Sequence, residues 1–404
     1  MAELRIRLYI MHMHPILRAF GFAIVLLALG AALVSPVAAK ELVSDDGIFI
    51  DMPSGFAPGE GDGKTRFSYF SPDGEVEFDI LIHDPGQFSS AEEMAAKMLE
   101  KLDSKGQSSS FVYEGRRVVI AELAFTLDGS PRRGYALFIS GSPSSAGRPA
   151  LGRGYALLAH ARASQFDSVV DFIMSCLDAF SIDRAARRSP GPISQFLLPW
   201  PAPRPDRKAA AFPGGRIELP WSSEEARQEL STVEREYRIL TTFLEDRKLW
   251  IDAWARFYRM VYRESAARLE GFTEAFARTL PADDPTESAR RVLAWVQDFV
   301  FERDLSGLDF VPPLVAAFER RGDCDSRAMV MAIILERLGV DSVLMLSREY
   351  SHAMLAVDVS GGGQRFSFKG RDYLVAETTA RVGLGMIDPS QADFSKWLGV
   401  DLGE

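Results

Sequence analysis

The chain contains few of the side chains that carry thiol, disulfide or metal chemistry. Its 404 residues include only two cysteines, Cys176 and Cys324, and five histidines. An exported protein built on disulfides would contain more cysteines in even numbers, so a disulfide framework is excluded. His83 and His160 have no partners at metal-ligand spacing, so we expect each to be an ordinary strand histidine. We therefore expect no metal and no other cofactor.

Basic charge is also scarce. The chain has 46 lysines and arginines against 56 aspartates and glutamates, a formal net charge of −10. This balance argues against nucleic-acid binding, which needs a basic face. With 47% hydrophobic residues, the length is typical of two or three globular units.

The first 39 residues are typical of a targeting segment. Three arginines precede an uncharged apolar run at residues 19–34, and Val37 and Ala39 fit a signal-peptidase site. We therefore expect export to the periplasm or the cell exterior, with Lys40 at the start of the mature chain. The run is at the short limit of a membrane span, so an uncleaved anchor is the alternative.

Residues 40–183 are predicted to form one α+β domain. Ser90 and Glu93 form a capping box that begins a helix, and an apolar stripe of helical period predicts a closing helix at 165–180. Cys176 lies in that stripe and is expected to be a buried, unreactive thiol. This order of elements resembles the Mog1/PsbP-like sandwich, which implies no chemistry. Strands are expected at 47–52, 65–71, 75–83, 117–127, 133–140 and 154–161.

A proline-rich linker is predicted at residues 184–221. Prolines recur from Pro190 to Pro220, and at this density they disfavour helix interiors and central strands, so we expect an extended, semi-rigid spacer. Its apolar stretch 196–200 is expected to dock on a neighbouring domain. The linker also concentrates arginines, which leaves contact with an anionic cell envelope open beside a simple solvated spacer.

A helical segment is predicted at residues 222–281. Ser222 and Glu225 form a capping box, and an apolar stripe of helical period continues over more than one helix, with a break near 245–248. Aromatic residues at helical spacing mostly bury, so we expect the stripe to pack on the following domain. A substrate-binding face is the alternative.

The last domain, residues 282–404, contains the motif GDCDSRA at 322–328, followed by an apolar run. This pattern predicts a buried helix with Gly322 and Asp323 at its entrance and Cys324 in its first turn. There the unpaired amide groups and the helix dipole favour a thiolate. The carboxylates of Asp323 and Asp325 would oppose it, so a base must contribute much of the activation.

His352 is the single histidine that follows this motif. It opens a strand-like run at 352–358, and Glu377 is the one carboxylate of a later run at 373–379. An unpaired charge among these apolar residues would destabilise the folded protein by on the order of several kcal/mol. If the two strands pair antiparallel, the start of the first faces the end of the second. His352 would then lie beside Glu377, although the intervening turns leave the register open.

The motifs around these three residues are similar to those of bacterial transglutaminase-like cysteine peptidases, over residues 285–390. Agreement extends to Gln297, to the sequence PPL at 312–314 and to GLG at 383–385. The resemblance implies a papain-like α+β core in which the cysteine, the histidine and the glutamate form a triad. Many members of the superfamily use aspartate as the third residue, where this chain has Glu377.

Gln297 is expected on a helix that begins at Asp284 and Pro285. A glutamine amide is a suitable donor to an oxyanion, and the resemblance implies that role for it. Without the resemblance, an ordinary exposed glutamine is the alternative.

The combined pattern predicts acyl transfer through a thioester on a peptide or glutamine-type amide. His352 would keep Cys324 as the thiolate, and Glu377 would orient the imidazole. With water as acceptor, the protein is a cysteine peptidase or amide hydrolase with a protein or peptide substrate, which we favour. With an amine as acceptor, it cross-links proteins.

Two other classes remain as alternatives. One is a non-catalytic envelope module that binds peptide or acts as a scaffold. The other is a zinc site of Cys324 and His352, which lacks a third and a fourth ligand. The sequence leaves the substrate and the oligomeric state open.

Overall fold

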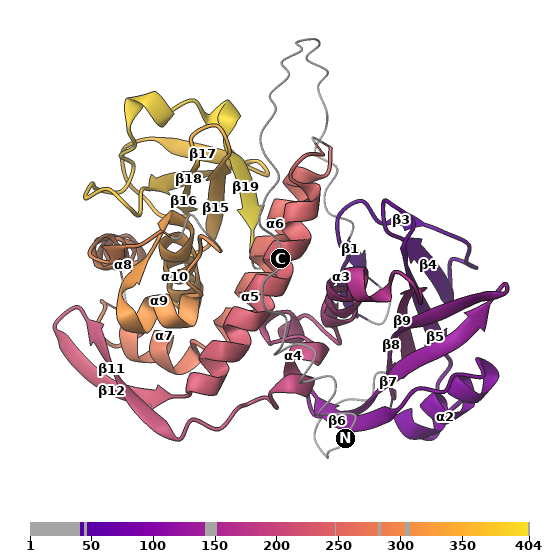
Figure 1. The fold of residues 1–404 in the computed structure, drawn as a ribbon. Helices are drawn as coiled ribbons and strands as arrows, with labels where there is room; N and C mark the ends of the chain where they lie inside the picture. Colours follow the sequence, from indigo (N-terminus) through magenta and orange to yellow (C-terminus); the bar gives the residue numbers. More distant parts are fainter. Residues whose placement is uncertain are drawn as a thin grey trace, which may run out of the picture.

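The structure, a computed structural model, describes residues 41–43, 47–141, 152–246, 248–281, 284–303 and 308–402. The expected signal segment at 1–39 lies outside these residues. Within them, no helix is both long and apolar enough to cross a membrane. They form a mixture of helices and several sheets, as expected for an α+β protein (Figure 1).

The N-terminal domain is built on a seven-stranded antiparallel sheet with the order β3-β4-β5-β9-β8-β7-β6. Burial alternates along β5, so its apolar side chains face one core and its polar side chains face the other surface of the sheet. Helix α3 packs on one face and helix α2 on the other. The elements are β3 (Ala57–Pro58), β4 (Arg66–Phe70), β5 (Val76–His83), α2 (Ala91–Lys101), β6 (Ser108–Tyr113), β7 (Arg116–Leu127), β8 (Ser130–Ile139), β9 (Gly154–Arg162) and α3 (Phe166–Asp178).

The six predicted strands of this domain and its two predicted helices are all present. The first of them pairs in a separate small sheet of β1 (Glu41–Val43), β2 (Phe49–Asp51) and β10 (Phe180–Ser181). The Ser90 hydroxyl accepts the backbone N–H of Glu93, as the capping box predicted. Strand β6 was missed, because three serines leave it only a short apolar signal.

The prediction of an extended spacer at 184–221 is wrong. The segment folds into η1 (Ala185–Arg188), α4 (Pro192–Leu197) and a hairpin of β11 (Asp206–Phe212) and β12 (Gly215–Trp221). Pro192 is compatible with the helix because it occupies the first turn, where the missing N–H has no partner to lose. Ile193 and Phe196 bury in the core of the N-terminal domain, which confirms the predicted docking of the apolar stretch.

The helical segment begins with two long helices that lie between the N-terminal and C-terminal domains (Figure 1). They are α5 (Ser223–Phe243) and α6 (Trp250–Ala266), and the predicted break at 245–248 falls between them; α7 (Glu270–Ala277) follows. The aromatic stripe shares one continuous core with the last domain, as expected; Phe257, Phe272 and Phe276 are among its buried members.

The C-terminal domain contains a five-stranded antiparallel sheet with the order β17-β18-β16-β15-β19. Helix α10, which carries the cysteine motif, packs on β15 and β16. The elements are α8 (Pro285–Gln297), β13 (Val300–Phe301), α9 (Pro313–Glu319), β14 (Arg321–Gly322), α10 (Cys324–Arg337), β15 (Ser342–Ser347), β16 (His352–Val357), β17 (Arg365–Phe368), β18 (Arg371–Ala376), η2 (Pro389–Gln391), η3 (Phe394–Lys396) and β19 (Leu398–Asp401).

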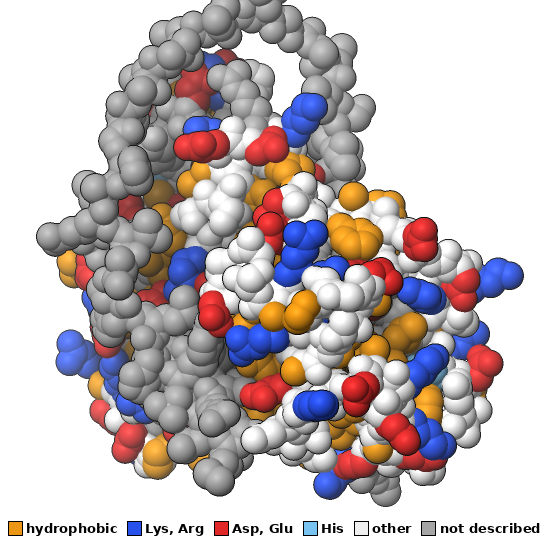
Figure 2. Space-filling view, turned by 45° about the vertical axis from the view of Figure 1, so that its right-hand side comes forward, with side chains coloured by type: hydrophobic (Ala, Val, Ile, Leu, Met, Phe, Trp, Pro, Cys, Tyr) orange, Lys and Arg blue, Asp and Glu red, His pale blue; other side chains and the backbone are white. Residues whose placement is uncertain are grey.

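Charged side chains of both signs are interspersed on the described part of the face in Figure 2. No broad basic area covers that part of the face, in keeping with the acidic composition. The basic side chains of 184–221 are also partly used within the fold: Arg204 pairs with Glu225, and Lys208 pairs with Glu319.

Candidate active site

Helix α10 begins at Cys324, as the motif predicted. Asp323 is the N-cap, and its Oδ1 accepts the backbone N–H of Ser326 at 2.8 Å and the Ser326 hydroxyl at 2.6 Å. Gly322 has φ +150°, and a Cβ there would lie 2.7 Å from the Ser326 Cβ. Glycine therefore allows the tight entrance that places Cys324 on the first turn of the helix.

His352 and Glu377 lie side by side, as the predicted antiparallel pairing of their strands requires. Strands β16 and β18 are antiparallel, with Leu355 opposite Ala376, so the start of one lies near the end of the other. The His352 Nε2 lies 2.7 Å from the Glu377 Oε2, and both side chains are mostly buried, with 12% and 6% exposed. The His352 ring also packs edge-on against the Trp397 ring, at 6.1 Å between centroids.

The Glu377 carboxylate is fixed on both oxygens. While Oε2 faces His352, Oε1 accepts the backbone N–H and the hydroxyl of Thr379 at 2.7 and 2.5 Å. Burial alone would raise the pKa of Glu377, but the hydrogen bond and the charge of His352 outweigh it and lower the pKa below its usual range. The carboxyl is therefore an ionised acceptor suited to orient an imidazole.

The sulfur lies against the beginning of strand β16. The backbone N–H of Ala353, the residue after His352, points toward the Cys324 sulfur and favours its anion. The cysteine, the histidine and the glutamate thus converge at the N-terminus of α10 and the adjoining ends of β16 and β18. Nε2 is engaged by Glu377, which leaves Nδ1 as the ring nitrogen for the sulfur.

The surroundings of the sulfur favour its protonated form. Cys324 Sγ lies 3.3 Å from the Asp325 Oδ1, in the geometry of a thiol that donates to a carboxylate. Burial raises the pKa of this thiol well above its ordinary range, and the charges of Asp325 and Asp323 raise it further. In this arrangement burial and the two carboxylates outweigh the hydrogen bond from Ala353, so the geometry does not support a resting thiolate. Between Cys324 and the His352 ring, both described, no hydrogen bond forms.

The two aspartates that flank Cys324 both have raised pKa values. Burial raises the pKa of Asp323, and the charge of Asp325 adds to this rise. Burial also raises the pKa of Asp325, although its bond to the Tyr258 hydroxyl opposes the rise. Crowding of buried like charges is a common property of catalytic sites.

Gln297 does not point its amide at an oxyanion position. Its Nε2 donates to the backbone carbonyls of Glu377 and Val382 at 2.8 and 3.0 Å, which uses both amide hydrogens. The implied oxyanion role is therefore not supported by this arrangement; Gln297 instead fixes the loop that carries the glutamate. Among the described residues, the backbone N–H of Cys324 makes no hydrogen bond and remains available.

Two further residues of the site were not found from the sequence. Tyr258, on α6, donates to Asp325 Oδ2 at 2.6 Å. Arg327 is buried on α10 and donates to the carbonyls of Gly322, Phe299 and Thr378, so it ties the cysteine loop to the glutamate loop. An arginine inside an otherwise apolar helix was a signal for such a role; Tyr258 gave none, because its contact depends on how α6 packs.

Two groups of potential metal ligands occur within the described ranges. Asp323, Cys324 and Asp325 form one, but Ser326 and Tyr258 already donate to its carboxylates. His352 is not part of this group, which weakens the alternative of a zinc site shared by Cys324 and His352.

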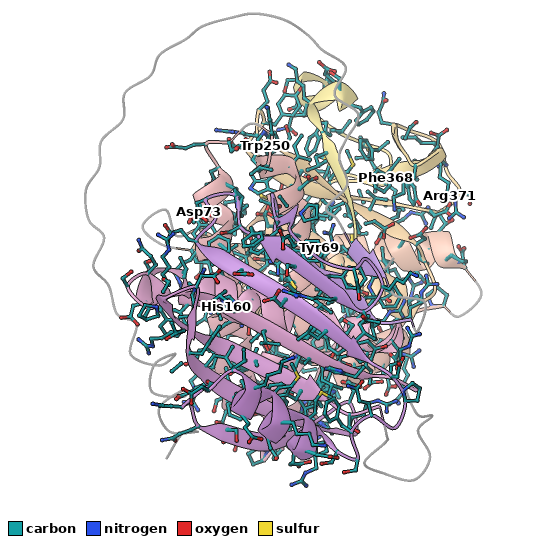
Figure 3. The ribbon with its side chains drawn as sticks, turned by 90° about the vertical axis from the view of Figure 1, so that its right-hand side faces the viewer. Tyr69, Asp73, His160, Trp250, Phe368 and Arg371 are labelled. Atoms are coloured by element: carbon teal, nitrogen blue, oxygen red, sulfur yellow. The ribbon has the colours of Figure 1, made fainter. Side chains whose placement is uncertain are left out.

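The second group lies on the N-terminal sheet, where Figure 3 shows His160 over the strands. The prediction that His160 lacks ligand partners is wrong, since Nε2 lies 3.4 Å from Asp79 Oδ2 and 4.0 Å from Glu77 Oε2. Strand pairing brings them together across β5 and β9. A metal-bound histidine normally donates its other ring N–H, yet within the described part of the chain the buried Nδ1 of His160 has no hydrogen-bond partner. We therefore assign no metal here.

None of the protein-family models scanned matches the chain, and no curated protein matches it significantly. The functional argument therefore depends on the geometry of the site.

Proposed function

We propose that the protein is an exported thiol hydrolase that forms a thioester on Cys324 while cleaving an amide bond of a protein or peptide. The observation that carries the proposal is the contact between His352 Nε2 and Glu377 Oε2 at 2.7 Å, next to a cysteine at a helix N-terminus. An ionised, doubly held carboxylate behind an imidazole is the arrangement that nucleophilic catalysis needs.

The fold is compatible with this proposal. A helix that begins at the cysteine and packs on an antiparallel sheet supports the papain-like, transglutaminase-like core that the sequence resemblance implies. The seven-stranded sheet with a helix on each face supports a Mog1/PsbP-like N-terminal domain.

The first half-reaction transfers the acyl group to sulfur. As Sγ of Cys324 attacks the carbonyl carbon, His352 Nδ1 takes the thiol proton, and the carbonyl π electrons move to oxygen. The Cys324 backbone N–H receives this oxyanion. When the tetrahedral intermediate collapses, the C–N bond breaks, and His352 gives its proton to the departing amine. Because Cys324 is placed to donate to Asp325, we assign His352 the role of a general base that takes the proton during attack.

The second half-reaction releases the acyl group. His352 removes a proton from water, the hydroxide adds to the thioester carbonyl, and the C–S bond breaks as the sulfur regains its proton. Glu377 stabilises the imidazolium in both halves. An amine in place of the water would give a cross-link, the second outcome that this site allows.

The proposal can be tested with p-nitrophenyl acetate, an activated acyl donor that needs no knowledge of the natural substrate. We expect a burst of one p-nitrophenolate per chain and an acetyl group mapped to Cys324. His352→Ala should slow the burst by roughly 10²–10⁴-fold, the usual contribution of a general base. Cys176→Ala is the matched control and should keep the burst, since Cys176 is fully buried.

The competing classes give different results in the same assay. Acetylation elsewhere, or acetylation of Cys324 at the same rate without His352, would leave only a binding or scaffold module. A large excess of a diamine distinguishes the two enzymes: rapid transfer of the acetyl group to the amine indicates an acyltransferase, and release to water indicates a hydrolase.

A further inference from the structure

The Asp325 carboxylate joins two parts of the molecule that are far apart in sequence. Its Oδ2 accepts the Tyr258 hydroxyl at 2.6 Å, and its Oδ1 accepts the Cys324 thiol at 3.3 Å. Tyr258 belongs to α6, outside the segment that resembles a known catalytic core. A side chain of the helical segment thus reaches the nucleophile through one intervening residue.

This chain of contacts determines where the thiol proton goes. The sulfur donates to Asp325 in the resting structure, whereas the proposed reaction requires that it give its proton to His352. Tyr258 favours the resting arrangement, because a hydrogen bond to a carboxylate stabilises the charged form that accepts the thiol. The charged and titratable groups that face Cys324 and Asp325 from the surrounding elements are Asp323, Arg327, Tyr258, Arg303, Asp309, His352 and Glu377.

The opposite side of α6 is fixed to the N-terminal domain. Arg256, Arg259 and Arg263 recur at helical spacing along it. Arg259 forms a bidentate pair with Asp51 at 2.8 Å for both bonds, and Arg256 donates to the Asp51 carbonyl at 2.9 Å. Arg263 donates to the Asp178 carbonyl at 2.7 Å. Tyr258 is therefore positioned by α6, and these contacts fix α6 to the N-terminal domain.

From these contacts we infer that Tyr258 is a positioning residue of the proposed enzyme. By holding Asp325, it keeps the Cys324 thiol directed at Asp325 and away from His352, and the N-terminal domain maintains this arrangement through α6. The inference rests on the proposed function. It assigns the N-terminal and helical domains a role in setting the reactivity of the nucleophile.

The test is the pH profile of Cys324 alkylation by iodoacetamide in the full-length exported chain. In Tyr258→Phe, the midpoint of the alkylation profile should move to lower pH, and the alkylation rate at pH 7 should rise on the order of threefold to tenfold. Asp325→Asn should shift the midpoint further, because it removes the carboxylate charge that opposes the thiolate. The matched control is Tyr262→Phe, one turn along the same helix, where the buried hydroxyl has no hydrogen-bond partner among the described residues; its profile should not change.

Each result decides the inference. If Tyr258→Phe keeps the wild-type profile, or Tyr262→Phe shifts it equally, the positioning role is overturned. Should Tyr258→Phe fail to fold, an unshifted Asp325→Asn profile would overturn it instead. Arg259→Gln should shift the midpoint in the same direction by less, and no shift would remove the part assigned to the N-terminal domain. The p-nitrophenyl acetate burst of the wild-type protein tests the proposed function separately.

Discussion

Two sets of buried aspartates in this protein have opposite electrostatic environments. At the junction of the N-terminal domain with α5, Asp178 accepts the backbone N–H groups of Ile193 and Ser194 and pairs with Arg235 at 2.5 Å. Burial alone would raise its pKa, but the arginine charges outweigh burial and lower the pKa below its usual range. Both oxygens of the Asp178 carboxylate therefore have hydrogen-bond partners.

At the cysteine, neutral hydroxyl groups donate to the aspartates: Ser326 donates to Asp323, and Tyr258 donates to Asp325. Burial still raises both pKa values, and the charge of Asp325 raises that of Asp323 further. Arg327 is a buried cation nearby, but it donates its hydrogen bonds to backbone carbonyls. At the Asp178 junction, paired buried charges hold the N-terminal domain to α5. Beside Cys324, in contrast, two buried carboxylates remain electrostatically unfavourable at the place where we propose the chemistry.

The largest expected effect is on stability, when the Asp178 junction is broken. Asp178→Ala removes one of the two carboxylates that pair with the buried Arg235, the other being Glu236, and it removes the acceptor for two amide groups. We therefore expect a loss of about 3–5 kcal/mol in the free energy of unfolding. Asp171→Ala is the control on the same helix, because its pair with Arg238 is exposed and should contribute only about 0–1 kcal/mol. Urea unfolding measures both, and equal losses would contradict the account.

The second effect has the opposite sign. Asp323→Asn keeps a good N-cap for α10 but removes a buried charge, so we expect the free energy of unfolding at pH 7 to increase by about 1–3 kcal/mol. The same urea experiment detects it. A destabilised variant would show that the charge is compensated in the folded protein.

The pH dependence of stability should separate the two regions. Asp323 has a raised folded pKa, so the folded state binds more protons than the unfolded one above about pH 4, and its contribution falls as pH rises toward neutrality. Asp178 has a lowered pKa, so its contribution is complete above about pH 4 and is lost as pH falls further. Stability curves of wild type and Asp323→Asn should therefore diverge between about pH 4 and 7 and coincide in more acidic solution.

The smallest effect concerns the second cysteine. Cys176 is fully buried, whereas Cys324 is partly exposed, so in the folded protein Cys176 should not react with iodoacetamide on the time scale of Cys324. Peptide mapping after partial alkylation should therefore find the label on Cys324 alone. Label on Cys176 under native conditions would show that the N-terminal core opens.

Local signals were sufficient for much of the fold and for the pairing at the centre of the site. The alternation in β5, the capping residues Ser90 and Ser222, and the apolar stripe of α6 each depend on neighbours within one or two turns. The contact of His352 with Glu377 followed from strand polarity and the cost of an isolated buried charge.

The errors concern features that tertiary contacts decide. Proline density suggested a spacer at 184–221, but burial of Ile193 and Phe196 and pairing of β11 with β12 outweighed it. Glu77 and Asp79 reach His160 only because β5 and β9 pair. The thiol state of Cys324 depends on the rotamer of Asp325 and on a tyrosine 67 residues away from it, which no local pattern contains.

The central claim is that His352 acts on the sulfur of Cys324. The most direct measurement is the second-order rate constant for alkylation of Cys324 between pH 6 and 9, in the wild-type protein and in His352→Ala. The account predicts that the variant reacts at least about tenfold more slowly near pH 7, where the imidazole can take the proton. Equal rate constants across the range, with both proteins folded, would contradict it.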